Sequence, residues 1–108
     1  MSSVQAKRVA SGTLTANTVD IVSLTDPGFG VEVTNLSGNG NLWFTVSEPG
    51  GPCPVPTAGG TSNEWCAASV SGATIKVRHA GQFGSIVQLI SGQAVTYAVA
   101  VTGARITD

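Results

Sequence analysis

The sequence predicts an all-β protein, an antiparallel β-sandwich of about eight short strands. Large apolar side chains recur at every second position in most segments, which is the period of a strand with one buried face. Nowhere do apolar side chains recur three and four residues apart over the length that an amphipathic helix needs. Turn residues, 14 Gly and 5 Pro, recur at short intervals between the alternating runs.

The alternation locates the strands in order along the chain. The predicted ranges are 6–15, 18–25, 29–36, 41–48, 64–69, 74–80, 84–91 and 94–103. Val31 and Val33 are expected to face the core, and Trp43 is expected to face outward because its two neighbours in the chain are large and apolar. Two layers of such strands pair their apolar faces as a sandwich, immunoglobulin-like or jelly-roll-like, or as a small flattened barrel.

Two connections between the predicted strands stand out. Ser37-Gly38-Asn39-Gly40 contains Asn-Gly, which favours a hairpin between the runs on either side of it. The segment 48–63 holds four of the five prolines and shows no strand pattern. Proline fixes φ and has no backbone donor, so this loop is predicted to be a stiff extended arm rather than a flexible linker.

The length of 108 residues fits one ordinary domain. Residues 1–11 are predicted to form an N-terminal arm, and residues 12–108 a single β-sandwich domain with the Pro/Gly-rich loop at 48–63. The arm contains Lys7 and Arg8 and no acidic residue. It is either a frayed, solvated end or a strand that leaves the sandwich and adds to a neighbour's sheet edge.

Charge is sparse along the chain. Lys+Arg number 5 and Asp+Glu 6, and charged residues make up 10% of the sequence against 42% for hydrophobic residues. This balance argues against a nucleic-acid-binding surface and against a disordered chain. No run approaches the roughly 20 apolar residues that cross a bilayer, and residues 1–8 lack the apolar core of a secretory signal. We therefore expect a soluble cytoplasmic product with no nucleic-acid or membrane partner.

The sequence predicts no catalytic residues, no metal site and no cofactor, so an enzyme is not expected. The acidic residues are scattered and mostly expected at outward or turn positions: Asp20, Asp26, Glu32, Glu48, Glu64 and Asp108. Cys53, Cys66 and His79 lack the Cys-x-x-Cys spacing and the fourth ligand of a structural zinc site. Cys53 and Cys66 either form a disulfide, with a stabilisation of roughly 3 kcal/mol, or stay as thiols in a reducing compartment.

The two tryptophans are the most informative aromatic residues. Trp43 is predicted to face outward, and Trp65 follows the proline-rich loop. Three roles stay open for Trp43: it is covered by that loop, it belongs to an exposed apolar patch that binds a partner, or it forms a platform on which a sugar stacks.

Several strand-and-turn runs resemble small tailed-bacteriophage virion proteins. The runs are 13–24, Val31-Glu32-Val33-Thr34-Asn35, Leu42-Trp43-Phe44-Thr45-Val46, Pro56-Thr57-Ala58-Gly59-Gly60-Thr61 and 87–99. The resemblance implies a capsid decoration (cement) protein that binds the major capsid protein on the outer surface of the head and stabilises the capsid. It implies a homotrimer, found on the virion and, during assembly, in the host cytoplasm. The insert 50–54 departs from the family's pattern.

On this hypothesis the residues expected to contact the partner are Val4, Lys7, Arg8, Val55, Trp65 and Trp43. Two other functions stay open: a carbohydrate-binding or adhesion module that uses a tryptophan as its platform, and a tail or head-completion component that differs only in its partner.

Overall fold

The structure is a computed structural model that describes residues 2–37, 40–48, 65–67, 72–81 and 84–102, with the backbone alone at 2, 65–67 and 79–81. The described residues form nine strands and no helix, which confirms the predicted all-β fold. The strands are β1 (Ser2–Ala6), β2 (Val9–Thr13), β3 (Asp20–Leu24), β4 (Gly28–Asn35), β5 (Leu42–Ser47), β6 (Trp65–Ala67), β7 (Ala73–Gly81), β8 (Ser85–Ile90) and β9 (Thr96–Thr102).

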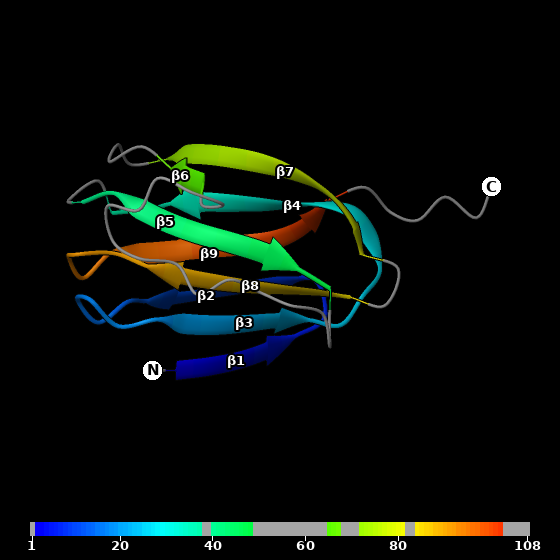
Figure 1. Ribbon diagram of the computed structural model, residues 1–108, viewed down its shortest axis with the longest axis horizontal. Coiled ribbons are helices and arrows are strands. Elements are labelled where there is room, and N and C mark those ends of the chain that lie inside the picture. The colour runs from blue at the N-terminus through cyan, green and yellow to red at the C-terminus, as the bar shows by residue number, and fades with distance from the viewer. Residues whose placement is uncertain (1, 38–39, 49–64, 68–71, 82–83, 103–108) are drawn as a thin grey trace.

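The strands lie in two stacked sheets. Sheet A has the order β1-β3-β8-β5-β6, and sheet B has the order β2-β9-β4-β7. Figure 1 looks onto sheet A, with sheet B behind it. Consecutive strands lie in different sheets at every step except from β5 to β6. Most connections therefore cross from one sheet to the other, and most strands that follow one another in the chain do not pair as β-hairpins.

The predicted N-terminal arm at residues 1–11 is wrong for the described residues. β1 pairs with β3 from Ser2↔Asp20 to Ala6↔Leu24, and this pairing is parallel, whereas the other strand pairs are antiparallel. β2 then pairs with β9 in sheet B. Val4 and Ala6 pack against the core. Because this segment completes the margin of both layers, it is part of the sandwich.

The hairpin that Asn-Gly favours at residues 37–40 does not form, because β4 lies in sheet B and β5 in sheet A. The buried Asn35 holds the end of β4 instead. Its amide nitrogen donates to the Gly40 carbonyl at 2.8 Å, and its side-chain oxygen accepts from the Ser37 N–H at 3.1 Å. The Ser37 hydroxyl also accepts from the Thr96 N–H at 2.6 Å. These bonds satisfy polar groups at a crossing between layers.

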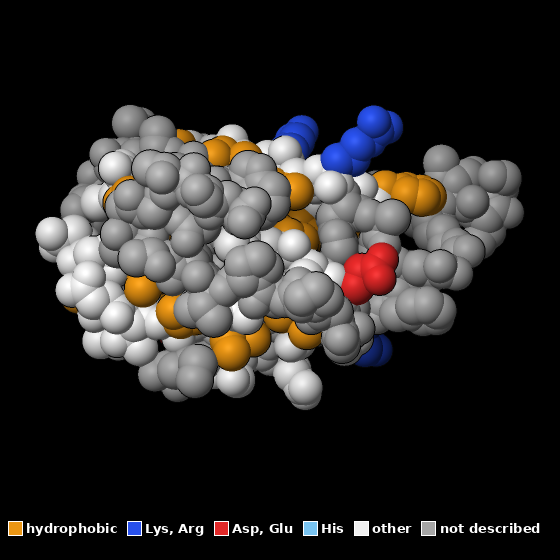
Figure 2. Space-filling model, in the orientation of Figure 1, with side chains coloured by type: hydrophobic (Ala, Val, Ile, Leu, Met, Phe, Trp, Pro, Cys, Tyr) orange, Lys and Arg blue, Asp and Glu red, His pale blue; other side chains and the backbone are white. Residues whose placement is uncertain are grey.

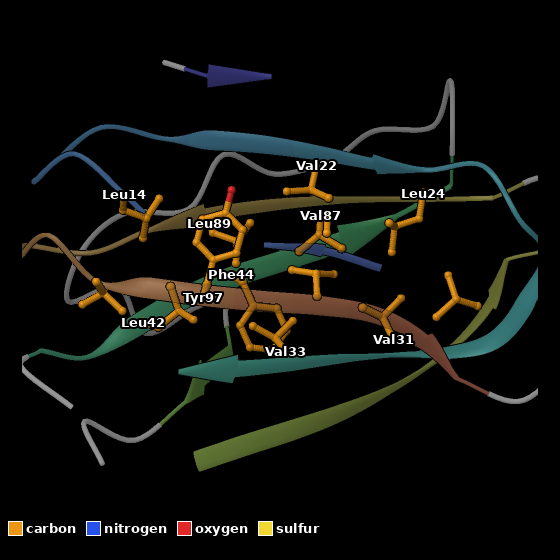
Figure 3. Packing of buried hydrophobic residues seen from close by; sticks show 14 residues of the cluster. Leu14, Val22, Leu24, Val31, Val33, Leu42, Phe44, Val87, Leu89 and Tyr97 are labelled. Atoms are coloured by element: carbon orange, nitrogen blue, oxygen red, sulfur yellow. The ribbon is translucent and has the colours of Figure 1, made fainter. Parts of the chain in front are cut away.

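The core lies between the two sheets (Figure 3). Both layers contribute fully buried side chains, including Leu42, Phe44, Val22, Val87 and Leu89 from sheet A and Val31, Val33, Tyr97 and Val99 from sheet B. The predicted alternation is confirmed in β4, where Val31 and Val33 are buried. It is also confirmed in β5, where Trp43 is only half-buried between two fully buried neighbours.

Candidate binding surface

The three N-terminal residues predicted to bind a partner have different surroundings. Val4 is half-buried and packs against the core. Lys7 and Arg8 are exposed where the chain crosses from β1 to β2. Their carbonyls accept from the Asp26 and Val101 N–H groups at 3.0 and 2.8 Å. The Arg8 guanidinium lies 3.7 Å from the Asp26 carboxylate. Backbone bonds thus fix this crossing, and the Lys7 side chain stays exposed.

Trp43 is the predicted contact residue whose place is clearest. It lies half-buried on the outer side of β5, where the backbone pairs with Ile90 of β8 on one side and Cys66 of β6 on the other. Trp65 pairs through its backbone with Phe44. The Trp65 and Cys66 side chains, together with Cys53 and Val55, lie outside the described residues, as does the predicted disulfide.

The predicted residues do not form one patch. In sheet A, β3 and β8 lie between β1 and β5, so roughly 14 Å separates the two strands at the usual spacing between neighbours. Lys7 follows the end of β1 that pairs with Leu24, whereas Trp43 pairs with Ile90 toward the opposite end of the sheet. The structure therefore separates Trp43 from Lys7 and Arg8.

The outer side of sheet A has no charged residue at the described positions of its strands. The outward positions, which alternate with core positions, are Ser3, Gln5, Ile21, Ser23, Trp43, Thr45, Ser47, Ile86, Gln88 and Ile90. We call Ile21, Trp43, Ile86 and Ile90 the isoleucine–tryptophan face. Along the outer side of sheet A, side-chain exposure rises from β5 toward β1. Thr45 and Ile90 are buried, Ile21 and Ile86 are half-buried, and Ser3 and Gln5 of β1 are exposed.

Figure 2 shows the same side of the molecule as Figure 1. Hydrophobic side chains are visible in a broken band across its left and centre. The charged side chains that are visible lie in the right-hand half. Among the described residues, the accessible apolar area of this side comes from the half-buried Ile21, Trp43 and Ile86, because Ile90 is only 8% exposed.

The outer side of sheet B is different, because its polar groups pair with one another. Lys76 Nζ lies 3.4 Å from Glu32 Oε1 across the β4–β7 pair. The hydroxyls of Thr34 and Thr74 are 2.8 Å apart, and those of Thr13 and Thr96 are 3.1 Å apart. Small residues fill most other outward positions on β9: Ala98, Ala100 and Thr102. Two large apolar side chains of this sheet are exposed beside these polar groups, Val9 of β2 at 64% and Phe29 of β4 at 52%.

A buried polar pair joins the two sheets. The Tyr97 hydroxyl of β9 donates to Asp20 Oδ2 of β3 at 3.0 Å, and the two residues are 0% and 5% exposed. Figure 3 shows the Tyr97 oxygen directed toward sheet A. Gly12 leaves room for it, because a Cβ there would lie 2.9 Å from the hydroxyl oxygen. Burial, and then the hydrogen bond and charge of Asp20, raise the pKa of the Tyr97 phenol well above its ordinary value.

The expectation that Asp20 is a solvated surface carboxylate is therefore wrong. Asp20, Val22 and Leu24 share the inward phase of β3, and that phase is the signal in the sequence that could have placed the acid inside. Because the pair is enclosed in the core, it has no access to a substrate, and we assign it a structural role.

The described residues contain no group of three or more His, Cys, Asp and Glu side chains that could hold a metal ion. They likewise include no helix of a length and hydropathy that could span a membrane. His79 lies within β7, and its side chain is outside the described residues.

No protein-family model and no curated protein matches the chain. Two solved structures are similar to it in fold. One is the pre-peptidase C-terminal domain of collagenase from Bacillus anthracis, with 10% identity and a TM-score of 0.45 over 94% of this chain and 93% of that one. The other is PliG, a periplasmic inhibitor of g-type lysozyme from Aeromonas hydrophila, with 16% identity and a TM-score of 0.47 over 94% and 96% of the two chains.

Proposed function

We propose that the chain is a non-enzymatic virion protein that binds the outer surface of a phage capsid and stabilises it. One observation carries the proposal: the isoleucine–tryptophan face lies on a sheet whose described outward positions have no charge. On a protein that works alone, such positions are where Lys and Glu are ordinarily found. A partner that covers this face gains the burial of its apolar area without desolvating a charge.

A capsid suits this surface because it repeats one binding site many times. The half-buried Ile21 and Ile86 offer a modest apolar area, which gives a weak contact by itself. Repeated attachment, or attachment of an assembled group of copies, raises the overall affinity without any new contact. A protein that bridges neighbouring capsid subunits in this way stabilises the shell by mass action.

The contact residues follow from this geometry. We assign Ile21, Ile86 and Trp43 to the bound surface and keep Lys7 at its margin, where it can contact the partner from the end of β1. Val4 is not part of the contact, because it faces the core.

The test is co-sedimentation with phage heads that lack the protein, taken from the phage whose genome encodes it. Ile86→Lys places a charge on β8, between the Ser23 and Ser47 positions of the neighbouring strands, so we expect head binding to fall by more than about tenfold. Ala98→Lys is the matched control, because Ala98 is half-buried on the outer side of β9, a central strand of sheet B. The control should bind as the unmodified protein does.

Equal binding by Ile86→Lys and the unmodified protein would remove the isoleucine–tryptophan face from the proposal. Failure of the unmodified protein to bind heads at all would remove the capsid as partner. Circular dichroism of both lysine variants checks that the sandwich is retained.

Trp43 supports a second candidate, a carbohydrate-binding or adhesion module. Its ring is half-buried beside the Ile90 position on an uncharged sheet, a setting in which an indole can stack on a sugar. A Trp65→Phe variant leaves Trp43 as the only tryptophan of the chain's 2. Its fluorescence should change during a glycan titration if this candidate is right and stay constant if the protein binds only capsids.

A further inference from the structure

One side of the sandwich presents an unpaired strand edge in both layers. In the described part of the chain, β1 is an edge strand of sheet A that pairs with β3 alone, and β2 is an edge strand of sheet B that pairs with β9 alone. A single crossing at Lys7 and Arg8 joins them. The segment from residue 2 to residue 13 therefore supplies an edge strand to each sheet, and Figure 1 shows β1 as the lowest strand of the view.

The hydrogen bonds identify which backbone groups of β1 remain open. The Ala6 carbonyl accepts from the Thr25 N–H at 3.0 Å, so Ala6 directs its backbone groups toward β3. In a parallel pair, alternate residues turn their N–H and C=O toward the same neighbour. Val4 therefore shares the direction of Ala6, whereas Ser3 and Gln5 turn their N–H and C=O away from the sheet.

The same argument applies to β2. The Arg8 carbonyl accepts from the Val101 N–H at 2.8 Å, and the Leu14 N–H donates to the Val95 carbonyl at 2.9 Å. Alternation then leaves the N–H and C=O of Val9, Ser11 and Thr13 open. Val9 is also 64% exposed, which makes it the most exposed large hydrophobic side chain among the described residues.

The other two edges differ from this one. β7 carries Lys76 and Arg78 at exposed positions, and charged side chains are a common protection against edge-to-edge pairing. β6 has 3 residues and is too short to template a partner strand. β1 has no charged residue, no proline and no register shift, so it lacks these protections.

We propose that β1 is a homodimerisation edge, which pairs antiparallel with β1 of a second copy about a twofold axis at Val4. In this register Ser3 of one copy lies opposite Gln5 of the other, and the N–H and C=O groups left open on both residues all find partners. A second copy is the occupant that fits, because it offers open groups with the same spacing and no charge to repel. The two copies of sheet A then form one continuous sheet.

This inference is independent of the proposed function, since the dimer forms without a capsid. A twofold contact predicts a dimer, whereas the phage resemblance implies a trimer.

The experiment is sedimentation equilibrium of the full chain over a concentration series, with Gln5→Pro and Gln5→Thr as a matched pair. Proline removes an N–H that the monomer does not use, and edge strands tolerate it. Threonine keeps the N–H and suits a strand. We expect the unmodified protein and Gln5→Thr to form dimers, and we expect the dimer dissociation constant of Gln5→Pro to be raised at least tenfold. A monomer or a trimer of the unmodified protein, or equal dimerisation by Gln5→Pro, would overturn the proposal.

A second measurement tests the proposed register between the two copies of β1 and uses substitutions that leave the backbone N–H groups in place. In a Cys53→Ser, Cys66→Ser background, Ser3→Cys and Gln5→Cys chains are mixed and oxidised. Facing residues of a hydrogen-bonded pair lie at a distance that a disulfide can bridge. The mixed disulfide between the two variants should form faster than either symmetric one. Equal rates for all three products would contradict the twofold register.

Discussion

The polar pair inside the sandwich and the ion pair on sheet B are similar in length and opposite in setting. Tyr97 Oη and Asp20 Oδ2 are 3.0 Å apart in the core, where both residues are at most 5% exposed. Lys76 Nζ and Glu32 Oε1 are 3.4 Å apart, with side chains 76% and 32% exposed. Water competes for the second pair and not for the first, so the two contribute very differently to stability.

This difference shows that the stability of the fold depends on polar pairing in the core and much less on polar pairing at the surface. Across sheet B, each surface group can exchange its partner for water at little cost. In the core, Asp20 and Tyr97 come from different layers, and each satisfies the other. Removal of one partner leaves the other buried and unsatisfied, and that penalty is larger than the value of the bond.

The largest expected effect is that of Tyr97→Phe. This change removes the phenol that donates to the buried Asp20 carboxylate, so we expect the free energy of unfolding to fall by about 2–4 kcal/mol. Urea denaturation measures the change. Thr34→Val is the matched control, because it removes a hydroxyl that lies 2.8 Å from Thr74 on the surface. The control should lose less than about 1 kcal/mol, and equal losses would remove the contrast between the two settings.

An intermediate effect is expected at alkaline pH. An ordinary tyrosine ionises near pH 10 in the unfolded chain, and Tyr97 keeps its proton to higher pH because its folded-state pKa is raised. Below about pH 10, Tyr97 is protonated in both the folded and the unfolded chain, and its full contribution to the free energy of unfolding is present. Above it the unfolded chain binds fewer protons than the folded chain, so stability falls by about 1.4 kcal/mol per pH unit.

Urea denaturation between about pH 9 and 12 tests this dependence. The chain has 1 tyrosine, so the Tyr97→Phe variant should lack this part of the decline while the ionisation of lysines continues to act in both proteins. Parallel curves for the two proteins would show that Tyr97 does not contribute to the alkaline loss.

The smallest expected effect is that of Lys76→Met, which breaks the exposed pair with Glu32 and keeps much of the aliphatic stem. We expect a change within about 0.5 kcal/mol, smaller still in high salt. A loss above about 1.5 kcal/mol by thermal or urea unfolding would mean that the ion pair is as important as the core pair.

The sequence predicted most of this fold because alternation is a local signal. β3, β4, β5, β7, β8 and β9 each show it, and their ranges agree closely with the predicted ones. β1 precedes the first predicted strand, which begins at residue 6, and Ser2–Ala6 contains only one large apolar residue, Val4. Its parallel pairing with β3 joins strands within sheet A that β2 separates in the sequence, and no local pattern predicts such a pairing. The crossing at residues 37–40 was interpreted as a hairpin for the same reason.

The candidate site was harder to predict. The outward direction of Trp43 followed from alternation and is confirmed. The isoleucine–tryptophan face was missed because Ile21, Ile86 and Trp43 come from three strands whose order in sheet A is a long-range property. Asp20 departs from the general expectation for a carboxylate because it shares the inward phase of β3 with Val22 and Leu24.

During synthesis on a ribosome, the pairing partners of β1 and β2 emerge at very different times. β1 finds its partner 18 residues later, since Ser2 pairs with Asp20. β2 pairs with β9, and the partner of Gly12 is Tyr97, 85 residues farther along. Sheet B consequently gains its β2–β9 pairing only after β9 has emerged, and the Asp20–Tyr97 bond between the layers forms no earlier.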